Sequence, residues 1–420
     1  MAEKMLPIKE AQEILLDRID PLPVVEVPLW QAVGLPAARP VTTDIDLSPF
    51  ANSAMDGYAV RTADLAAASP EAPVALDVVG HEAAGHVFEG QVGAGEAVRI
   101  MTGAPVPEGA DAVVKYEVVT VTGGDGNEGS QASFTAPAKP GENIREAGLE
   151  ARAGGVVIEE GEVLTPAGCG LAASAGATAV PVHRAPRIGI ISLGTELVAP
   201  GERPGRGQIR DSNSSALMAA AAAAGAEPEF YGIAPDDRDA IEAVIRRAAS
   251  SCDMVVTSGG ASAGDYDYVT ALVAREGEVL FDRIAMKPGK AITFGIFDGT
   301  PFLGLSGNPA AAVVGFELLA RPAIRKMRGH RADARPRQVA RLTHDVRKRG
   351  SRRLFNRARV ERDPRSGVLE VTEMRSQNSA LLSTMQRANC LLEIAEDAAG
   401  PVAGEMVDVV RIDIEEGTEL

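Results

Sequence analysis

The stretch "RIGIISLGTEL", residues 187–197, begins with an apolar run and ends in a loop that carries Gly194 and Glu196. A short run that is apolar at nearly every position is typical of a strand buried on both faces, as in a parallel sheet. Up to about residue 330 the chain goes on to alternate strand-like and helix-like segments. This alternation predicts βαβ units. We therefore expect an α/β domain with a mostly parallel sheet over residues 186–330.

Further strand-like runs in this region are "PEFYGIA", "CDMVVTSGG" and "TPFLGLSGNP", and they are separated by helix-like runs such as "RDAIEAVIRRAAS". Ligands of such sheets bind at the carboxyl ends of the strands. Glycine and polar residues follow the predicted strands at that edge, so the site is expected there.

The rest of the chain favours β structure. Residues 24–140 contain short valine-rich runs separated by glycine and proline, and short strands return after residue 331. These patterns predict a small β domain and a closing β domain. Helical spacing over residues 8–20 predicts a first helix, and Pro166 can begin another.

Composition excludes several classes of protein. The net charge of −16 argues against a nucleic-acid binder, and no apolar run reaches the ~18–20 residues of a membrane helix. Cys169, Cys252 and Cys390 are far apart among apolar residues, which is typical of reduced core thiols and a cytoplasmic protein. The five histidines show no ligand spacing, and Trp30 is expected to be a core anchor.

One segment departs from the acidic balance. Residues 331–360 carry eleven Lys and Arg against two Asp. Either this is a solvated strand face, or it is one wall of an anion site.

Four strand-end loops are suited to an anionic ligand: "SLGTEL", "TSGGASAGDYD", "MKPGK" and "LSGNPAAAV". In the last, Asn308 is a good N-cap and Pro309 a good first helical residue, so free backbone N–H groups would face a ligand above Ser306 and Gly307. Each loop alone is also ordinary turn chemistry; four at one sheet edge predict an anion cradle.

Charged residues accompany these loops. Glu196 and Asp267 belong to two of them, and Arg283, Lys287 and Lys290 lie in or near a third. Carboxylates facing a phosphate require a cation between them, and Mg²⁺ prefers carboxylate and phosphate oxygens. A metal-bridged phosphate is one interpretation; the other is that each acid only caps a helix N-terminus.

The motifs "SAMDGYAV", "MTGAPVP", "SLGTEL", "SGGASAGDYD", "MKPGK" and "LSGNP" follow one another in this order. With them the sequence closely resembles the MoeA family of molybdopterin molybdenumtransferases, which is related to the E domain of gephyrin. The resemblance covers nearly the whole chain.

The resemblance implies an elongated four-domain protein and a homodimer whose active sites are shared between subunits. The domains would be a linker domain (1–26, 42–54 and 141–185), a small β domain (27–41 and 55–140), the molybdopterin-binding α/β domain (186–330) and a β-barrel-like domain (331–420). It also implies Mg²⁺-dependent insertion of molybdate into adenylylated molybdopterin, with release of AMP. An adenylylating enzyme and acceptor apo-molybdoenzymes would be transient partners.

Residue by residue, the resemblance implies a catalytic group of Asp56, Glu196, Asp267, Arg283 and Lys287, with Glu196 and Asp267 as the Mg²⁺ ligands. Asp56 and Thr102 would complete the site of the neighbouring subunit. Substrate-binding residues would be Thr102, Glu150, Ser258, Gly259, Gly260, Ser262, Pro288, Lys290, Ser306, Gly307, Asn308, Pro309, Arg352 and Arg357.

The sequence departs from the family pattern at five positions. Ala51 and Thr195 stand where acids are common, Glu150 where Asp is common, Arg283 where Lys is frequent and Leu354 where an acid is common. No core carboxylate is lost. The departures therefore bear on substrate geometry rather than on the class of reaction.

Two other functions are compatible with this fold. A dimeric scaffold would tolerate loss of the cleft acids, but Asp56, Glu196 and Asp267 are all present. The related adenylylating enzymes typically carry "SGGTG", whereas this chain reads "SGGASAGDYDY". The choice between molybdate and tungstate stays open, because the two oxyanions share shape and charge.

Overall fold

The computed structural model describes residues 5–260 and 268–418. The chain divides into two compact units. One unit joins the N-terminal segment up to Glu26 to the chain from Pro181 onward, and the other runs from Val27 to Val180. Strands β1 (Val24–Pro28) and β12 (Ala179–His183) carry the chain between them.

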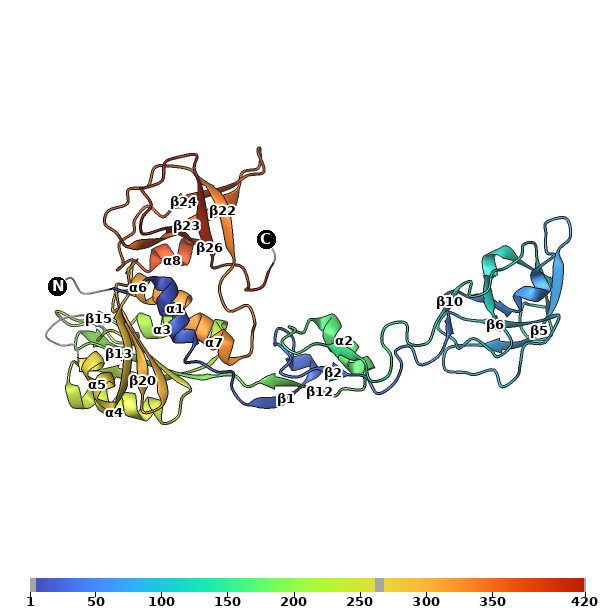
Figure 1. The fold of residues 1–420 in the computed structure, drawn as a ribbon, viewed down its shortest axis with the longest axis horizontal. Coiled ribbons are helices and arrows are strands. Elements are labelled where there is room, and N and C mark those ends of the chain that lie inside the picture. Colours follow the sequence, from blue (N-terminus) through green and yellow to red (C-terminus); the bar gives the residue numbers. More distant parts are fainter. Residues whose placement is uncertain (1–4, 261–267, 419–420) are drawn as a thin grey trace. The chain divides into compact units, whose positions relative to one another are not determined.

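The first unit is built on a six-stranded sheet in the order β16-β13-β17-β21-β20-β18 (Figure 1). The first four strands are parallel to one another, and the last two are antiparallel to their neighbours. The mostly parallel sheet predicted from the sequence is thus confirmed. The strands are β13 (Arg187–Leu193), β16 (Glu227–Ala234), β17 (Met254–Ser258), β18 (Gly277–Arg283), β20 (Ala291–Phe297) and β21 (Thr300–Leu305).

Helices cover both faces of this sheet, which explains why its strands are apolar throughout. Ile188 and Ile190 of β13 belong to the same core as α1, α3 and the helical run from α6 to α7, whereas Ile191 and Leu193 pack with α4 and α5. The helices are α1 (Ile8–Leu16), α3 (Asn213–Ala223), α4 (Arg238–Ala249), α5 (Tyr268–Glu276), α6 (Pro309–Gly315) and α7 (Arg321–Met327), with a π-helical turn η4 (Phe316–Ala320) between the last two.

The same unit ends in a small closed β-barrel. Strand order β23-β24-β22-β26-β25 returns to its start because β23 also pairs with β25. The short strand β19 (Met286–Lys287) of the α/β part joins β23 in parallel. The barrel strands are β22 (Arg337–Leu342), β23 (Arg353–Arg362), β24 (Leu369–Glu373), β25 (Cys390–Ile394) and β26 (Met406–Arg411), and α8 (Ser383–Arg387) precedes β25.

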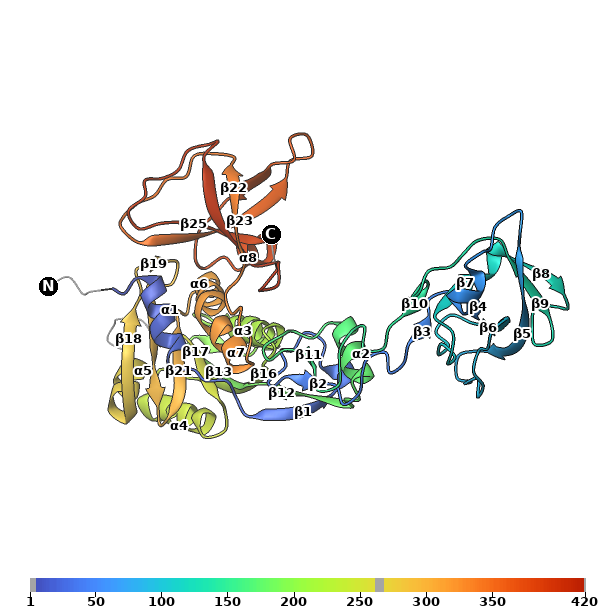
Figure 2. The same cartoon turned by 45° about the vertical axis from the view of Figure 1, so that its right-hand side comes forward.

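The second unit contains a six-stranded sheet in the order β7-β4-β6-β5-β9-β8 (Figure 2). Its strands are β4 (Gly57–Val60), β5 (Val74–Glu82), β6 (Glu96–Ile100), β7 (Ala112–Lys115), β8 (Val119–Gly123) and β9 (Gln131–Phe134). Two-stranded sheets form from β3 (Asn52–Ser53) with β10 (Ile144–Arg145) and from β2 (Val41–Thr42) with β11 (Val156–Ile158), and α2 (Pro166–Ser174) follows. The helix expected after Thr165 is confirmed. The four-domain division stays a prediction.

Two smaller expectations have different outcomes. Cys252 and Cys390 are buried free thiols, as predicted, while Cys169 is half-buried. The prediction that Trp30 anchors a core is wrong, because its side chain is 76% exposed in this chain. The one-turn helix η1 (Leu29–Gln31) turns the indole outward, and Ala32 takes the buried position instead.

Within the described ranges, no helix is long and apolar enough to cross a membrane.

Candidate functional site

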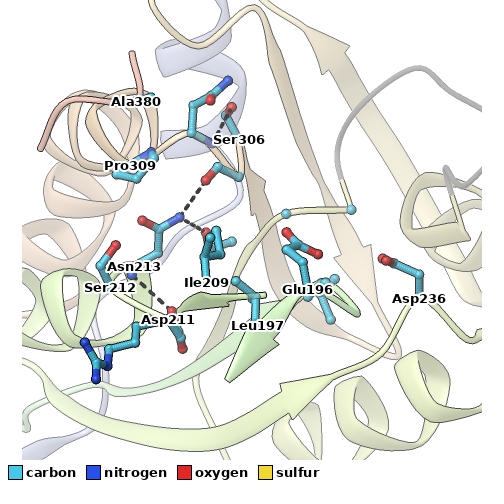
Figure 3. Close-up of a pocket in the computed structure, with 18 of the residues that line it drawn as sticks. Glu196, Leu197, Ile209, Asp211, Ser212, Asn213, Asp236, Ser306, Pro309 and Ala380 are labelled. Atoms are coloured by element: carbon cyan, nitrogen blue, oxygen red, sulfur yellow. Dashed lines mark hydrogen bonds between the residues drawn. The ribbon is translucent and has the colours of Figure 1, made fainter. Parts of the chain in front are cut away.

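A cavity of about 540 Å³ opens at the carboxyl edge of the parallel strands. It is lined by the loops after β13, β17 and β21, by the start of α3, and by Ala380 of the segment that precedes α8 (Figure 3). The sequence predicted this edge of the sheet. Its predicted residues found in the lining are Glu196, Ser258, Gly259, Gly260, Ser306, Gly307, Asn308 and Pro309.

Glu196 brings an exposed carboxylate to the cavity. Its loop turns at Gly194, where φ is +153°. A Cβ at Gly194 would lie 2.5 Å from Oε2 of Glu196, so a side chain there would push the flexible carboxylate out of its present position. Among the described residues, no hydrogen bond or ion pair holds the Glu196 side chain.

A second carboxylate, that of Asp236, also lines the cavity near Glu196 (Figure 3). The Thr195 N–H donates to Oδ2 of Asp236 at 3.1 Å, and the Asp236 N–H donates to Oγ1 of Thr195 at 3.0 Å. This reciprocal pair joins the loop after β13 to the loop after β16 at the rim of the cavity. Thr195, which stands where an acid is common in the family, thus has a structural role at this rim. The sequence signal for Asp236 is its position just after the strand-like run "PEFYGIA", which alone does not distinguish it from an ordinary turn residue.

The loop after β17 depends on glycine for close backbone approach. Gly259 has φ of +92°, and a Cβ there would lie 2.4 Å from the carbonyl oxygen of Leu193. That contact is to a backbone atom, which cannot rotate away as a side chain can. A side chain at residue 259 would therefore force the backbone of the neighbouring loop to shift. Ser262 and Asp267, predicted from the same loop, lie outside the described residues.

The loop before α6 differs in part from the expectation. Asn308 is the N-cap residue and Pro309 the first helical residue, as predicted, but the Asn308 side chain makes no capping bond. The N–H groups of the first turn of α6 are not free, so this part of the predicted cradle is wrong. The Ala310 N–H donates to Ser379 O at 2.9 Å, and the N–H groups of residues 311 and 312 donate to Asn308 O.

Nothing in the local sequence of Asn213, at the start of α3, distinguishes it from an ordinary helix start. Its amide nitrogen donates to Oγ of Ser258 at 2.6 Å and to the carbonyl oxygen of Gly307 at 2.8 Å (Figure 3). Oδ1 of Asp211 accepts the N–H groups of Asn213 and Ser214 and so caps this helix. Three loops of the cavity are therefore tied together at one amide.

The predicted cations are not among the residues that line the cavity. Lys287 is exposed on β19 and stands opposite Leu354 of β23, while Arg352 donates from Nη1 to the carbonyl oxygen of Met286 at 3.3 Å. Lys290 is also exposed, and the next residue, Ala291, lines the cavity. Arg283 ends β18 and Pro288 is buried. Leu354 itself belongs to the barrel core.

Arg357 has a different environment from the one expected for a substrate ligand. Only 1% of it is exposed, and it donates to Oγ1 of Thr384 and to the carbonyl oxygen of Asn378. Burial holds the pKa of its guanidinium below the usual value. Arg357 therefore braces the segment that ends at Ala380 in the cavity wall.

Much of the basic segment 331–360 is neutralised within the barrel and its attachment. The arginines with carboxylate partners are Arg335, Arg337, Arg341, Arg353 and Arg359. The first interpretation, a solvated strand face, fits Arg337, Arg341 and Arg359, whose side chains reach solvent from β22 and β23. Arg335 and Arg353 are largely buried and ion-paired, so neither interpretation describes them.

In the second unit, Asp56 and Thr102 form one motif. Oδ1 of Asp56 accepts both the N–H and the hydroxyl of Thr102, each at 2.8 Å. These bonds, the backbone one foremost, hold the pKa of Asp56 below its usual value. Both residues are exposed, as is Glu150 in the turn after β10.

Metal ligation can be tested against the donors present. Among the described residues no group of three or more His, Cys, Asp or Glu is assembled for a metal ion. Mg²⁺, however, is usually held by one or two carboxylates together with waters and substrate phosphates. The open, unpartnered carboxylate of Glu196 fits that mode of binding.

Three family models match successive parts of this chain. Residues 6–176 match the MoeA N-terminal region (domain I and II), residues 189–326 a probable molybdopterin binding domain, and residues 339–412 the MoeA C-terminal region (domain IV). The chain belongs to the MoeA family. Every residue that lines the cavity except Ala380 therefore lies in the part of the chain that matches the molybdopterin binding domain.

Relatives in the MoeA family align over nearly full length. The chain is 35% identical to the molybdopterin molybdenumtransferase of Haemophilus influenzae, over 96% of this chain and 98% of the relative. It is 38% identical to molybdopterin molybdenumtransferase 2 of Mycobacterium tuberculosis, over 96% and 99%. The crystal structure of the molybdopterin biosynthesis MoeA protein from Pyrococcus horikoshii OT3 superposes with a TM-score of 0.82 at 31% identity, covering 97% of this chain and all of the other.

Proposed function

We propose that this protein inserts molybdate into adenylylated molybdopterin and releases AMP, giving the molybdenum cofactor. The observation that carries the proposal is the cavity in the molybdopterin-binding part of the chain, which presents the carboxylates of Glu196 and Asp236, with the exposed Lys290 next to the lining residue Ala291. Family membership adds the reaction class.

Charge explains why such a site suits two anionic substrates. Molybdate is a dianion and adenylylated molybdopterin is polyanionic, so their approach requires fixed positive charge. Lys287, Lys290 and Arg352 supply it where the α/β part meets the barrel. We propose that Lys287 and Arg283 stabilise the charge that develops when the phosphoanhydride breaks.

Glu196 and Asp267 are the proposed Mg²⁺ ligands. When bound, Mg²⁺ would neutralise charge on the phosphoanhydride. Glu196 suits this role because no partner among the described residues competes for its carboxylate, and Asp236 lines the same cavity as a further acceptor.

We also propose a cytoplasmic homodimer in which Asp56 and Thr102 of one subunit complete the cavity of the other. In support, the Thr102 hydrogen bonds keep the exposed Asp56 ionised and point it in a fixed direction. Asp56 would then orient water or metal, and Glu150 and the cleft residues named above would hold substrate. An adenylylating enzyme would deliver the substrate, and apo-molybdoenzymes would accept the product.

The test of the reaction uses the full-length protein with adenylylated molybdopterin, Mg²⁺ and molybdate. AMP release and reconstitution of an apo-molybdoenzyme are both measured, with tungstate in a parallel series. Asp267→Ala and Lys287→Ala should each lower turnover about 10²- to 10³-fold. Near-normal AMP release by both variants would rule out the assigned roles, and no AMP release by the wild type would rule out the reaction.

The shared site is tested by mixing two inactive variants. Asp56→Ala and Lys287→Ala subunits, co-expressed with different tags, should yield heterodimers with one intact site each, and thus about a quarter of wild-type activity in a random mixture. Activity no greater than that of the two separate variants would contradict sharing between subunits.

A further inference from the structure

Asn213 occupies an unusual place, because its side chain joins two loops that are distant in sequence. The amide nitrogen Nδ2 lies 2.6 Å from Oγ of Ser258, after which the β17 loop begins, and 2.8 Å from the carbonyl oxygen of Gly307, in the loop before α6. Asn213 is 9% exposed and Ser258 3% exposed. Both residues line the cavity.

The direction of these two hydrogen bonds is fixed by chemistry. The Gly307 carbonyl oxygen can only accept, so the amide must turn its NH₂ group toward it. One N–H then goes to Gly307 and the other to Ser258. The amide oxygen Oδ1 is left buried with no partner among the described residues, which is unfavourable for a polar atom. The two hydrogen bonds that the amide nitrogen donates therefore hold the side chain in place.

This arrangement determines what the Ser258 hydroxyl can do. Its oxygen already accepts from Asn213, so its own hydrogen must point elsewhere. Among the described residues no acceptor for that hydrogen is found. Ser258 lines the cavity, so the hydrogen is available to an acceptor bound there.

Building on the proposed function, we propose that Asn213 is a positioning residue that holds the Ser258 hydroxyl so that its hydrogen donates to an anionic oxygen of the substrate, either phosphate or molybdate. A serine with a free rotor could accept or donate. Here Asn213 takes one of the two acceptor lone pairs of Ser258 and turns the hydroxyl hydrogen away from itself, so that hydrogen is left for an acceptor bound in the cavity. Asn213 also holds the Gly307 loop in register with the Ser258 loop.

The test is a double-mutant cycle on binding, measured by calorimetry with the full-length protein. The variants are Asn213→Leu, which keeps roughly the size of the side chain, loses both N–H donors and adds no charge, Ser258→Ala, and the pair combined. Each ligand is titrated separately: metal-free molybdopterin, and inorganic pyrophosphate as an anion without a pterin. Ser192→Ala is the control, because Ser192 lies beside Ser258 on the next strand, is fully buried and has no hydrogen-bond partner among the described residues.

Each single variant should weaken pyrophosphate binding about tenfold to a hundredfold, the range for a hydrogen bond to a charged acceptor. The combined variant should bind no more weakly than the worse single variant, because both changes abolish the same hydrogen bond, the one that Ser258 donates to the anion. Ser192→Ala should bind as the wild type does. Melting temperatures distinguish an effect on folding from an effect on binding. If Asn213 only held two loops together, its variant would lower the melting temperature, but its loss of affinity would not be coupled to that of Ser258→Ala.

Three results would overturn the inference: Asn213→Leu with unchanged affinity, losses that multiply in the combined variant, or no pyrophosphate binding by the wild type. Failure of the proposed function looks different. If the proposed function is wrong, the wild type should not bind molybdopterin, while the variants still show coupled losses of pyrophosphate affinity. Ser258 would then be an anion donor in a protein that takes no pterin substrate.

Discussion

Two groups of charges in the first unit contrast sharply. At the cavity, Glu196 and Lys287 are exposed, and neither has an ion pair among the described residues. Near the C-terminus, the Glu416 cluster, made of Glu317, Arg321, Arg325, Arg335 and Glu416, is buried or nearly so. The side chain of Glu416 is fully buried and contacts three arginines of this cluster.

The contrast shows how one chain separates charges for folding from charges for chemistry. A buried charge is tolerated only when partners replace its lost hydration. A charge that binds a substrate is left without a protein partner, and water hydrates it until the ligand binds. Sequence composition cannot distinguish the two kinds of charge, since both consist of the same residue types.

The largest expected effect breaks the buried side of the comparison. Glu416→Gln keeps the size of the side chain but leaves Glu317 as the one carboxylate for the three arginines of the cluster, so the free energy of unfolding should fall by about 3–5 kcal/mol. Denaturation followed by far-UV circular dichroism measures it, because most of the helices belong to this unit. Glu415→Gln, at the exposed neighbour, should change stability by less than about 0.5 kcal/mol. Equal effects of the two would contradict the comparison.

The next effect tests the exposed side. Lys287→Ala should lower the rate of AMP release about 10²- to 10³-fold, or about 3–4 kcal/mol of transition-state stabilisation, with little change in stability. Lys9→Ala removes an exposed lysine on α1 and should leave the rate unchanged. A loss of stability in Lys287→Ala that matched its loss of rate would show that Lys287 belongs with the structural charges.

A pH dependence follows from His330, which adjoins the cluster. Its Nδ1 accepts from Nη2 of Arg325 at 3.0 Å, and burial, aided by the nearby arginines, lowers its pKa to about 4. The unfolded chain binds a proton near pH 6.5 and the folded one only near 4, so stability is lost as pH falls through this window. His330→Asn should flatten that slope, which is worth on the order of 3 kcal/mol.

Far-UV circular dichroism at several pH values measures the slope for His330→Asn and for the exposed control His81→Asn. Glu416 acts in the same direction at lower pH. Burial alone would raise its pKa, but the Arg321 hydrogen bond and charge outweigh this and lower it. Its contribution is therefore lost only below about pH 4.5. A His330→Asn slope as steep as that of wild type would assign the whole dependence to carboxylates.

The smallest effect concerns the rim of the cavity. Thr195→Val removes the acceptor for the Asp236 N–H, and Thr195→Ser keeps it. Valine should cost about 1 kcal/mol or less in stability, and serine almost nothing. The same denaturation experiment distinguishes them, and a large loss for valine would mean that the rim is structural rather than adaptable.

Sequence reasoning predicted the part of the fold that local pattern controls. Apolar runs such as residues 187–193 are strands because their periodicity is local, and the loops after them meet at one edge because the strands are parallel. Eight of the predicted residues therefore line one cavity. Asn213 and Asp236 were missed because nothing in their local sequence separates a cavity wall from an ordinary helix start or turn.

By itself, the sequence determined the alternating α/β core, the barrel strands and the glycines that allow close backbone approach at the cavity. Only the tertiary structure decided which charges are neutralised by partners: it paired Arg335 and Arg353 with carboxylates and buried Arg357. It also decided that Trp30 is exposed. The physical reason is that periodicity is a property of neighbours along the chain. Whether a charge is solvated or cancelled depends on residues brought from distant segments.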